Sequence, residues 1–266
     1  DLENLAKKYR VKYFKNKKFL SSYYEYLISL TSNSKHIGTT NEWIVDNYYQ
    51  IVEEEKAIKS FLKNREACKH AFNKRIDLYA VMRKILVRNK FKIDMNTLIT
   101  DLNKYQDNYE HQFTYHEINA IGVVSYLVLI DELVELCQRE QQRLNEIKSA
   151  DSLIETINAD VKKYHEVDIN DYITINDDIV NRPIYLERLN AGLKELGQIS
   201  NDIFKQLGII LDKAHINLNN LFESVYQKIA NENLLVANIF TSVNKINALN
   251  FLFTLYNNIF FKIIFF

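Results

Sequence analysis

Glycine and proline are scarce in this chain, which has five glycines and one proline among 266 residues. Ordinary proteins carry roughly 12% of these two residues together. β-Sandwiches, β-barrels and doubly wound α/β folds need both at their many turns, so the shortage argues against all three classes. It also argues against a nucleotide-binding fold, because loops that surround a phosphate need glycine to let the backbone approach the anion.

Cysteine is scarce and net charge is absent. The two cysteines, Cys68 and Cys137, are too few for a disulfide scaffold, and each falls in a helical pattern where a small buried thiol is expected. The 34 basic residues balance the 34 acidic residues. A protein that binds nucleic acid through its overall charge is usually basic, so we expect no nucleic-acid partner.

No local sequence pattern indicates a catalytic or metal site. His111 and His116 do not have the i, i+4 spacing that aligns two metal ligands on a helix, and the acidic segment from Asp168 lacks the glycine of a calcium loop. There is no Gly-x-Ser-x-Gly motif. We therefore predict no catalytic residue, no metal site and no cofactor. A pair of acids that converges only in space, as in glycoside hydrolysis, is an alternative that a sequence does not reveal.

What the chain does have is helical periodicity. Apolar residues recur at three- and four-residue steps, and hydrophobic residues make up 47% of the total. Two pairs, Thr39 with Glu42 and Thr114 with Glu117, have the spacing of a helix-capping box, and Asp94 is placed to cap a shorter helix. The apolar stripes predict a helix over 41–62 and a second one that continues through 68–86.

The longest predicted helix runs from Thr114 to Ile147. Its segment from Ala120 to Ile130 is apolar on almost all sides, which is typical of a helix in a protein core or in a membrane. Because this run ends at Asp131, it is shorter than the roughly 20 residues that cross a bilayer. We predict an all-α fold, an elongated multi-helix bundle with this long helix buried at its centre.

An acidic segment divides the predicted bundle. Residues 165–182 have no helical stripe, and Pro183 follows where a helix can begin. We predict a helical N-terminal half at 1–164, an acidic linker at 165–182 and a helical C-terminal half at 183–250 that packs on the first. Residues 251–266 form an apolar tail that is too short for a clear membrane span. The aspartates of the predicted linker are Asp168, Asp171, Asp177 and Asp178.

Basic residues gather near the N-terminus and alternate there with aromatic ones. Such a stretch could bind the anionic headgroups of a membrane surface, or it could be a solvated helix face, which is the commoner role of a charge run. The basic residues are Lys7, Lys8, Arg10, Lys12, Lys15, Lys17 and Lys18.

Four segments carry a more specific signal. The first extends from Thr39 to Leu62, with matching residues Glu42, Trp43, Asp46, Asn47, Tyr48, Ile51, Glu53 and Glu54. The second and third are 84–106 and 115–136. The fourth extends from Leu234 to Phe251, with matching residues Val236, Asn238, Ile239, Thr241, Ser242, Val243, Ile246, Ala248, Leu249 and Phe251. In order and spacing these segments resemble the N-terminal helical region of bacterial cyclic β-1,2-glucan synthases. The chain departs from the family at Asn119 and Gly122, where the family has Trp and Pro, and at Lys90-Phe91-Lys92, where it has an Asp-Gly turn.

The resemblance implies a non-catalytic helical scaffold. The family's enzymes build cyclic glucan from a nucleotide sugar at an inner membrane, and their catalytic domains lie C-terminal to the matching region. No catalytic residue of the family therefore falls in this chain. The implied partner is a downstream glycosyltransferase domain, and the implied location is the cytoplasmic side of an inner-membrane protein. The alternative is a stand-alone or truncated helical domain that binds another protein.

Seven matching residues form the expected structural or interaction signature: Glu42, Trp43, Asp46, Asn47, Asn238, Thr241 and Ser242. Trp43, Asp46 and Asn47 share one helix face because they are three and four positions apart. We predict that Trp43 packs in the core and that Asp46 and Asn47 are at least partly buried, with hydrogen bonds to a neighbouring helix. The signature would then be a folding device rather than a sugar site, and Asp46→Ala would cost about 1–3 kcal/mol.

Overall fold

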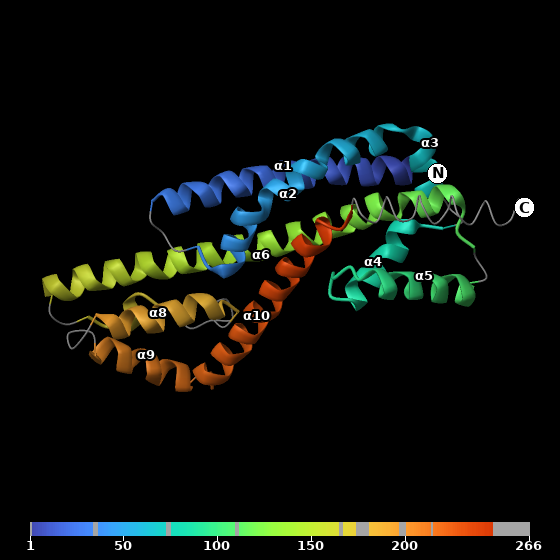
Figure 1. The fold of residues 1–266 in the computed structure, drawn as a ribbon. Helices are drawn as coiled ribbons and strands as arrows, with labels where there is room; N and C mark the ends of the chain where they lie inside the picture. Colours follow the sequence, from blue (N-terminus) through green and yellow to red (C-terminus); the bar gives the residue numbers. More distant parts are fainter. Residues whose placement is uncertain are drawn as a thin grey trace, which may run out of the picture. The chain divides into compact units, whose positions relative to one another are not determined.

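The computed structural model describes residues 2–33, 37–72, 76–109, 112–164, 167–173, 181–196, 201–213 and 215–246. Every regular element in these ranges is helical, which confirms the all-α class (Figure 1). The predicted tail at 251–266 lies outside the described residues. The helices are α1 (Leu2–Ser32), α2 (Thr39–Lys63), α3 (Arg65–Ala71), α4 (Leu78–Arg88), α5 (Met95–Tyr109), α6 (Tyr115–Tyr164), the short 3-10 helix η1 (Ile169–Asp171), α8 (Pro183–Glu195), α9 (Asn201–Lys213) and α10 (Leu218–Val243).

The chain divides into two compact units at positions that the sequence did not indicate. Unit 1 comprises Asp1–Cys137 and Glu232–Phe266, and unit 2 comprises Gln138–Asn231. The predicted division lay at 165–182 instead. Ile169 and Ile173, in the described part of that segment, are buried in the apolar core of unit 2. The aspartates made the segment resemble a linker, but burial of two isoleucine side chains four positions apart stabilises its packing against the core of unit 2.

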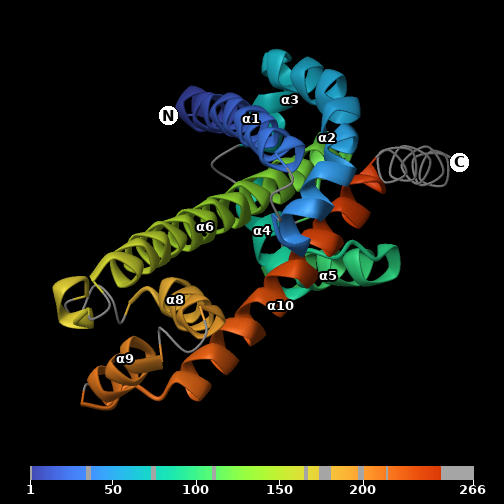
Figure 2. The ribbon, with the colours of Figure 1, turned by 90° about the vertical axis from the view of Figure 1, so that its left-hand side faces the viewer.

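Unit 1 is built around the first part of α6. Residues 120–134 are all buried, as predicted for the central helix. Figures 1 and 2 show this part of α6 between α1 on one side and α4 with α5 on the other. The face that α1 presents to this core recurs every three or four residues and consists of Tyr9, Tyr13, Asn16, Leu20, Tyr23 and Leu27. Tyrosine is therefore the main aromatic of the core face of α1, and its hydroxyls bring polar atoms into the interior.

The start of α6 confirms the predicted capping box. The Thr114 backbone N–H donates to Glu117 Oε2 at 2.8 Å, and the Glu117 N–H donates to Thr114 Oγ1 at 3.3 Å. Asp94 likewise accepts from the Thr97 N–H at 3.0 Å, as predicted for the cap of α5. The helix that begins at Tyr115 extends to Tyr164, well past the predicted end at Ile147.

The other predicted capping box is wrong. Helix α2 begins at Thr39, so its N-cap is Gly38, which has a φ of 82° and provides no side-chain cap. The hydroxyl of the next residue, Thr40, donates instead to Asn233 Oδ1 on α10. The helix thus begins one residue earlier than the predicted box requires, so Thr39 lies inside the first turn and is not the N-cap.

The predicted helix over 68–86 is also interrupted. Asn64 separates α2 from α3 and accepts from the Ala67 N–H at 3.1 Å, and Asp77 caps α4 by accepting from the Tyr79 N–H at 3.1 Å. Short polar side chains such as these compete with the helical backbone for its own hydrogen bonds, so they favour helix starts over helix interiors. Phe72 lies in the interruption and is fully buried.

Unit 2 packs α8 and α9 against each other and against the second part of α6. Pro183 begins α8, as predicted. Helix α8 approaches α6 closely at Gly192, where an added Cβ would lie 2.2 Å from Cδ1 of Ile154 on α6. A glycine in the middle of a helix costs about 1 kcal/mol relative to alanine, and here it allows two helices to come together.

Asp101 links α4 to α5 through an ion pair with Arg88 and a 2.9 Å hydrogen bond from Asn89 Nδ2. Burial alone would raise the pKa of this carboxyl, but the hydrogen bonds from Arg88 and Asn89 outweigh it and hold the pKa below the ordinary value. A depressed folded-state pKa stabilises the fold above the unfolded pKa, near 3.9, and this contribution is lost as the pH falls through the folded value.

We expect Asp101→Asn to destabilise the protein most near neutral pH, with the difference from the parent shrinking below about pH 4. The measurement is a series of urea unfolding curves at several pH values. A difference that stays constant across the acid range would show that the Asp101 charge does not stabilise this contact.

Candidate functional site

The α2 part of the signature faces solvent, which corrects the predicted folding role. Trp43 is 41% exposed, and Asp46 and Glu42 are exposed as well. Asn47 is partly buried as predicted, but its hydrogen bonds stay within α2: it donates to Trp43 O at 2.8 Å and accepts from Gln50 Nε2 at 3.0 Å. The buried stripe of α2 runs through Ile44, Ile51, Ile58 and Leu62, and the tryptophan face lies beside it. Asp46→Ala is therefore expected to change stability by no more than about 0.5 kcal/mol.

The α10 part of the signature has the structural role that was expected of α2. Ser242 is fully buried, accepts from the Ile93 N–H at 2.8 Å and donates to Phe91 O at 2.9 Å. Asn238 Nδ2 donates to Lys90 O at 2.9 Å. Thr241 is exposed, and its hydroxyl donates to Ala237 O within α10. The structure thus brings Asn238 and Ser242 together at the α4–α5 connection, and no hydrogen bond or ion pair of the described residues joins them to Trp43 or Asp46.

The α4–α5 connection needs this support because its backbone is strained. Lys90 and Phe91 have φ angles of 51° and 57°, in the left-handed region that L-residues other than asparagine and aspartate seldom adopt. Hydrogen bonds from α10 hold the two residues in a conformation that glycine would adopt without strain.

Lys90→Gly is expected to stabilise unit 1 by about 1 kcal/mol, because glycine removes the left-handed strain while the Lys90 carbonyl keeps its bond to Asn238. The test is the urea midpoint. The matched control is Lys92→Gly, at an exposed lysine outside the left-handed pair, which should stabilise nothing. Equal effects of the two changes would contradict the assignment of strain to Lys90.

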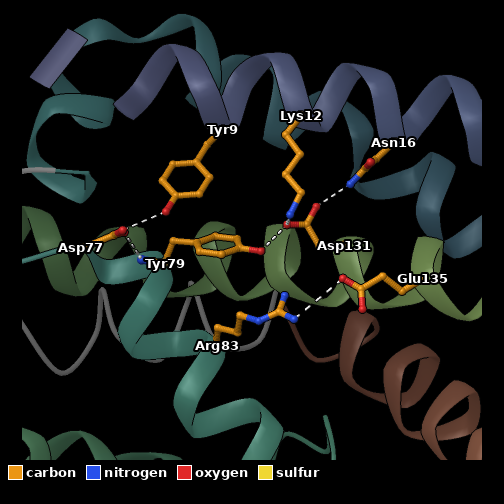
Figure 3. A network of polar contacts seen from close by, with 8 residues as sticks. All are labelled: Tyr9, Lys12, Asn16, Asp77, Tyr79, Arg83, Asp131 and Glu135. Carbon is orange, nitrogen blue, oxygen red and sulfur yellow. Dashed lines mark hydrogen bonds and ion pairs between the residues drawn. The ribbon is translucent and has the colours of Figure 1, made fainter. Parts of the chain in front are cut away.

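The most extensive polar network of unit 1 is centred on Asp131 (Figure 3). This carboxylate is 5% exposed and accepts from Asn16 Nδ2 at 2.5 Å and from the Tyr79 hydroxyl, and it forms a 2.6 Å ion pair with Lys12. Its partners come from α1 and α4, so one side chain of α6 fixes two neighbouring helices. Arg83 of α4 adds a 3.8 Å ion pair to Glu135, one turn further along α6.

Two tyrosines carry the network toward the start of α4. The Tyr9 hydroxyl donates to Asp77 Oδ2 at 2.8 Å, and the rings of Tyr9 and Tyr79 stack with their centres 4.4 Å apart. Burial, followed by the hydrogen bonds to Asp77 and Asp131, raises the pKa of both phenols far above 10. Both hydroxyls therefore remain protonated donors at any physiological pH.

The network joins α1, α4 and α6. Each oxygen of Asp131 already has a donor, and both phenols are held in the protonated form, so these three groups are engaged in contacts between helices. This role of Asp131 was not predicted from the sequence. The available signal was an acid placed directly after an apolar run, because a buried carboxylate requires partners.

The basic N-terminal stretch is divided by the fold. Lys12 and Lys17 turn inward and pair with Asp131 and Glu55. Lys7 and Arg10 instead line a hollow of about 290 Å³, whose other basic residues are Arg65 and Lys69 on α3. This basic hollow is floored by Ala6, Leu62 and Cys68.

A second hollow of about 200 Å³ lies between α1, α2 and α6 and is lined by Tyr13, Tyr48 and Tyr126. Its charged groups are engaged with one another, since Glu55 pairs with Lys17 and Lys59. The hydrogen bonds that Lys17 and Lys59 donate to Glu55 lower the pKa of its carboxyl. The basic hollow is therefore the better candidate for binding an anionic ligand, because four cationic side chains line it.

Among the described residues no group of histidines, cysteines and acids could hold a metal ion. None of the helices in the same ranges combines the length and the apolar character of a membrane span.

Comparison of the chain with models of known protein families gives no match. Comparisons with curated proteins and with solved structures give no match either.

Proposed function

We propose that this chain is a non-catalytic helical scaffold that docks on another protein through the exposed Trp43 face of α2. The resemblance to cyclic β-1,2-glucan synthases supplies the partner, a glycosyltransferase domain at the cytoplasmic side of an inner membrane. That identification of the partner rests on the four matching sequence segments alone.

One observation carries the proposal, the exposure of the Glu-Trp and Asp-Asn signature. Trp43 is 41% exposed, and Asp46 has no interaction with a neighbouring helix among the described residues. Asp46 therefore contributes little to the fold of unit 1, and a large part of the Trp43 side chain is open to solvent. An exposed tryptophan next to an acid is typical of a protein interface, where tryptophan is among the residues that contribute most to binding.

Two measurements test the two parts of the proposal. The purified chain is incubated with a uridine-diphosphate sugar, and no glucan product is expected; measurable turnover would refute the non-catalytic assignment. For docking, the chain is expressed together with the glycosyltransferase domain of a cyclic β-1,2-glucan synthase, and co-purification of the two is measured.

Trp43→Ala combined with Asp46→Ala is expected to abolish co-purification while the chain still unfolds in a cooperative thermal transition, with a melting temperature that falls only modestly because Trp43 is partly buried. The matched control is Tyr226→Ala combined with Glu223→Ala, which also removes an exposed aromatic residue and an acid three positions apart on a helix, but in unit 2. The control should co-purify like the parent. Equal loss in both variants, or no co-purification of the parent, would sink the docking proposal.

A further inference from the structure

The basic hollow of unit 1 has a composition that the scaffold role leaves unexplained. Lys7 and Arg10 lie three positions apart on α1, and Arg65 and Lys69 lie four positions apart on α3, so each pair shares a helix face. Helices α1 and α3 pack together, which brings the two pairs to one hollow. Four cationic side chains from two helices thus surround a single space.

One of these cations has a described acidic partner: Lys69 forms a 3.3 Å ion pair with Glu66, which is exposed. Among the side chains that the structure describes (from Ala6 onward on α1), no ion pair joins Lys7, Arg10 or Arg65 to an acid, whereas Lys12 and Lys17 on the same helix both have buried or half-buried partners. Like charges gathered around a hollow repel one another, so an anion that neutralised them would stabilise the arrangement.

The floor of the basic hollow is apolar. Leu62 and Cys68 are 3% and 5% exposed, and the Cys68 Sγ is directed to the carbonyl oxygens of Phe61 and Leu62 at 3.5 and 3.8 Å. Burial raises the pKa of this thiol, although the charge of nearby Arg10 acts in the opposite direction. Cys68 therefore contributes a neutral surface rather than a nucleophile, and the chemistry of the hollow belongs to its rim.

We infer that the basic hollow binds a phosphomonoester. A phosphate group offers several acceptor oxygens and up to two negative charges, and arginine binds it in a two-pronged geometry while lysine contributes a point charge. The volume of about 290 Å³ exceeds what a bare phosphate fills and is close to the lower end of small-molecule sites, about 300 Å³. The apolar floor accommodates the carbon skeleton of the ligand. A soluble sugar or glycerol phosphate and the headgroup of phosphatidic acid share this chemistry.

Two probes distinguish the soluble source from the lipid source. In the first experiment, glycerol 3-phosphate is titrated into the full chain and the heat of binding is measured by calorimetry. In the second, the fraction of the chain that sediments with phosphatidylcholine vesicles is measured for vesicles that contain phosphatidic acid and for vesicles that lack it. Binding of glycerol 3-phosphate assigns a soluble ligand. Binding only to the vesicles with phosphatidic acid assigns a lipid headgroup.

The variants decide whether the hollow is the site. Arg10→Gln combined with Arg65→Gln removes one cation from each of the two helices, α1 and α3, that line the hollow. This double variant is expected to bind about tenfold or more weakly to whichever probe the parent binds. Lys15→Gln combined with Lys18→Gln removes the same charge from exposed positions of α1 outside the hollow, and binding should stay within about twofold of the parent. Failure of both probes to bind the parent, or equal weakening in the two variants, would overturn the inference. Neither outcome bears on docking through Trp43.

Discussion

Replacing Asp131 with alanine is expected to lower the free energy of unfolding of unit 1 by about 2–5 kcal/mol, because it removes the acceptor that two buried donors share. The change leaves the donors of Asn16 and Tyr79 without an acceptor in the core, and each unpaired buried group costs about 1–3 kcal/mol. Lys12 adds less, because its side chain is 42% exposed and regains water.

Urea unfolding followed by tryptophan fluorescence is a suitable measurement, because Trp43 is the single tryptophan and lies in unit 1. Asp46→Ala is the control, since it removes an acid from the surface of the same unit. Asp131→Asn should fall between the two, because an amide keeps one acceptor oxygen but loses the charge. A loss below about 1 kcal/mol for Asp131→Ala would show that the network is dispensable.

Ser242→Ala is expected to cost about 2–4 kcal/mol, because it leaves the buried Ile93 N–H and Phe91 carbonyl without partners. The change also withdraws support from the left-handed backbone at Lys90 and Phe91. Alanine fills almost the same space as serine, so the effect reports hydrogen bonds and not packing.

Thr241→Ala is the matched control for Ser242→Ala. It removes the adjacent hydroxyl, which bonds only within α10 and is exposed, and it should change stability by no more than about 0.5 kcal/mol. The same fluorescence-detected unfolding applies to both. Similar values for the two variants would contradict the assigned role of Ser242.

The local features of this protein could be predicted from its sequence. Few glycines and prolines argue against folds with many turns, and the run from Ala120 to Ile130, which is apolar on almost all sides, predicts a buried helix, as the structure confirms. The capping box at Thr114 and Glu117 forms as predicted, whereas the box at Thr39 and Glu42, with the same spacing, does not. Spacing along the chain makes a cap possible, because capping partners are neighbours in the sequence, but it does not fix the residue at which the helix begins.

The contacts between helices that are far apart in the sequence could not be predicted, and these include the Asp131 network and the hydrogen bonds of Ser242. Asp131 meets Asn16 across 115 positions, and Ser242 meets Phe91 across 151. The periodicity of a sequence indicates which residues lie beside an apolar stripe, but it does not indicate whether another helix covers them. Trp43 was therefore expected in the core, whereas the structure places it at the surface, 41% exposed.

The basic N-terminal stretch also shows what the sequence determines and what depends on the tertiary structure. The sequence by itself determined that cations would crowd the N-terminal helix. Only the tertiary structure decided that Lys12 and Lys17 would be neutralised by acids of other helices, while Lys7 and Arg10 would meet Arg65 and Lys69 around one hollow. The physical reason is that charge pairing depends on distances of a few ångströms through space, which packing sets and sequence separation does not.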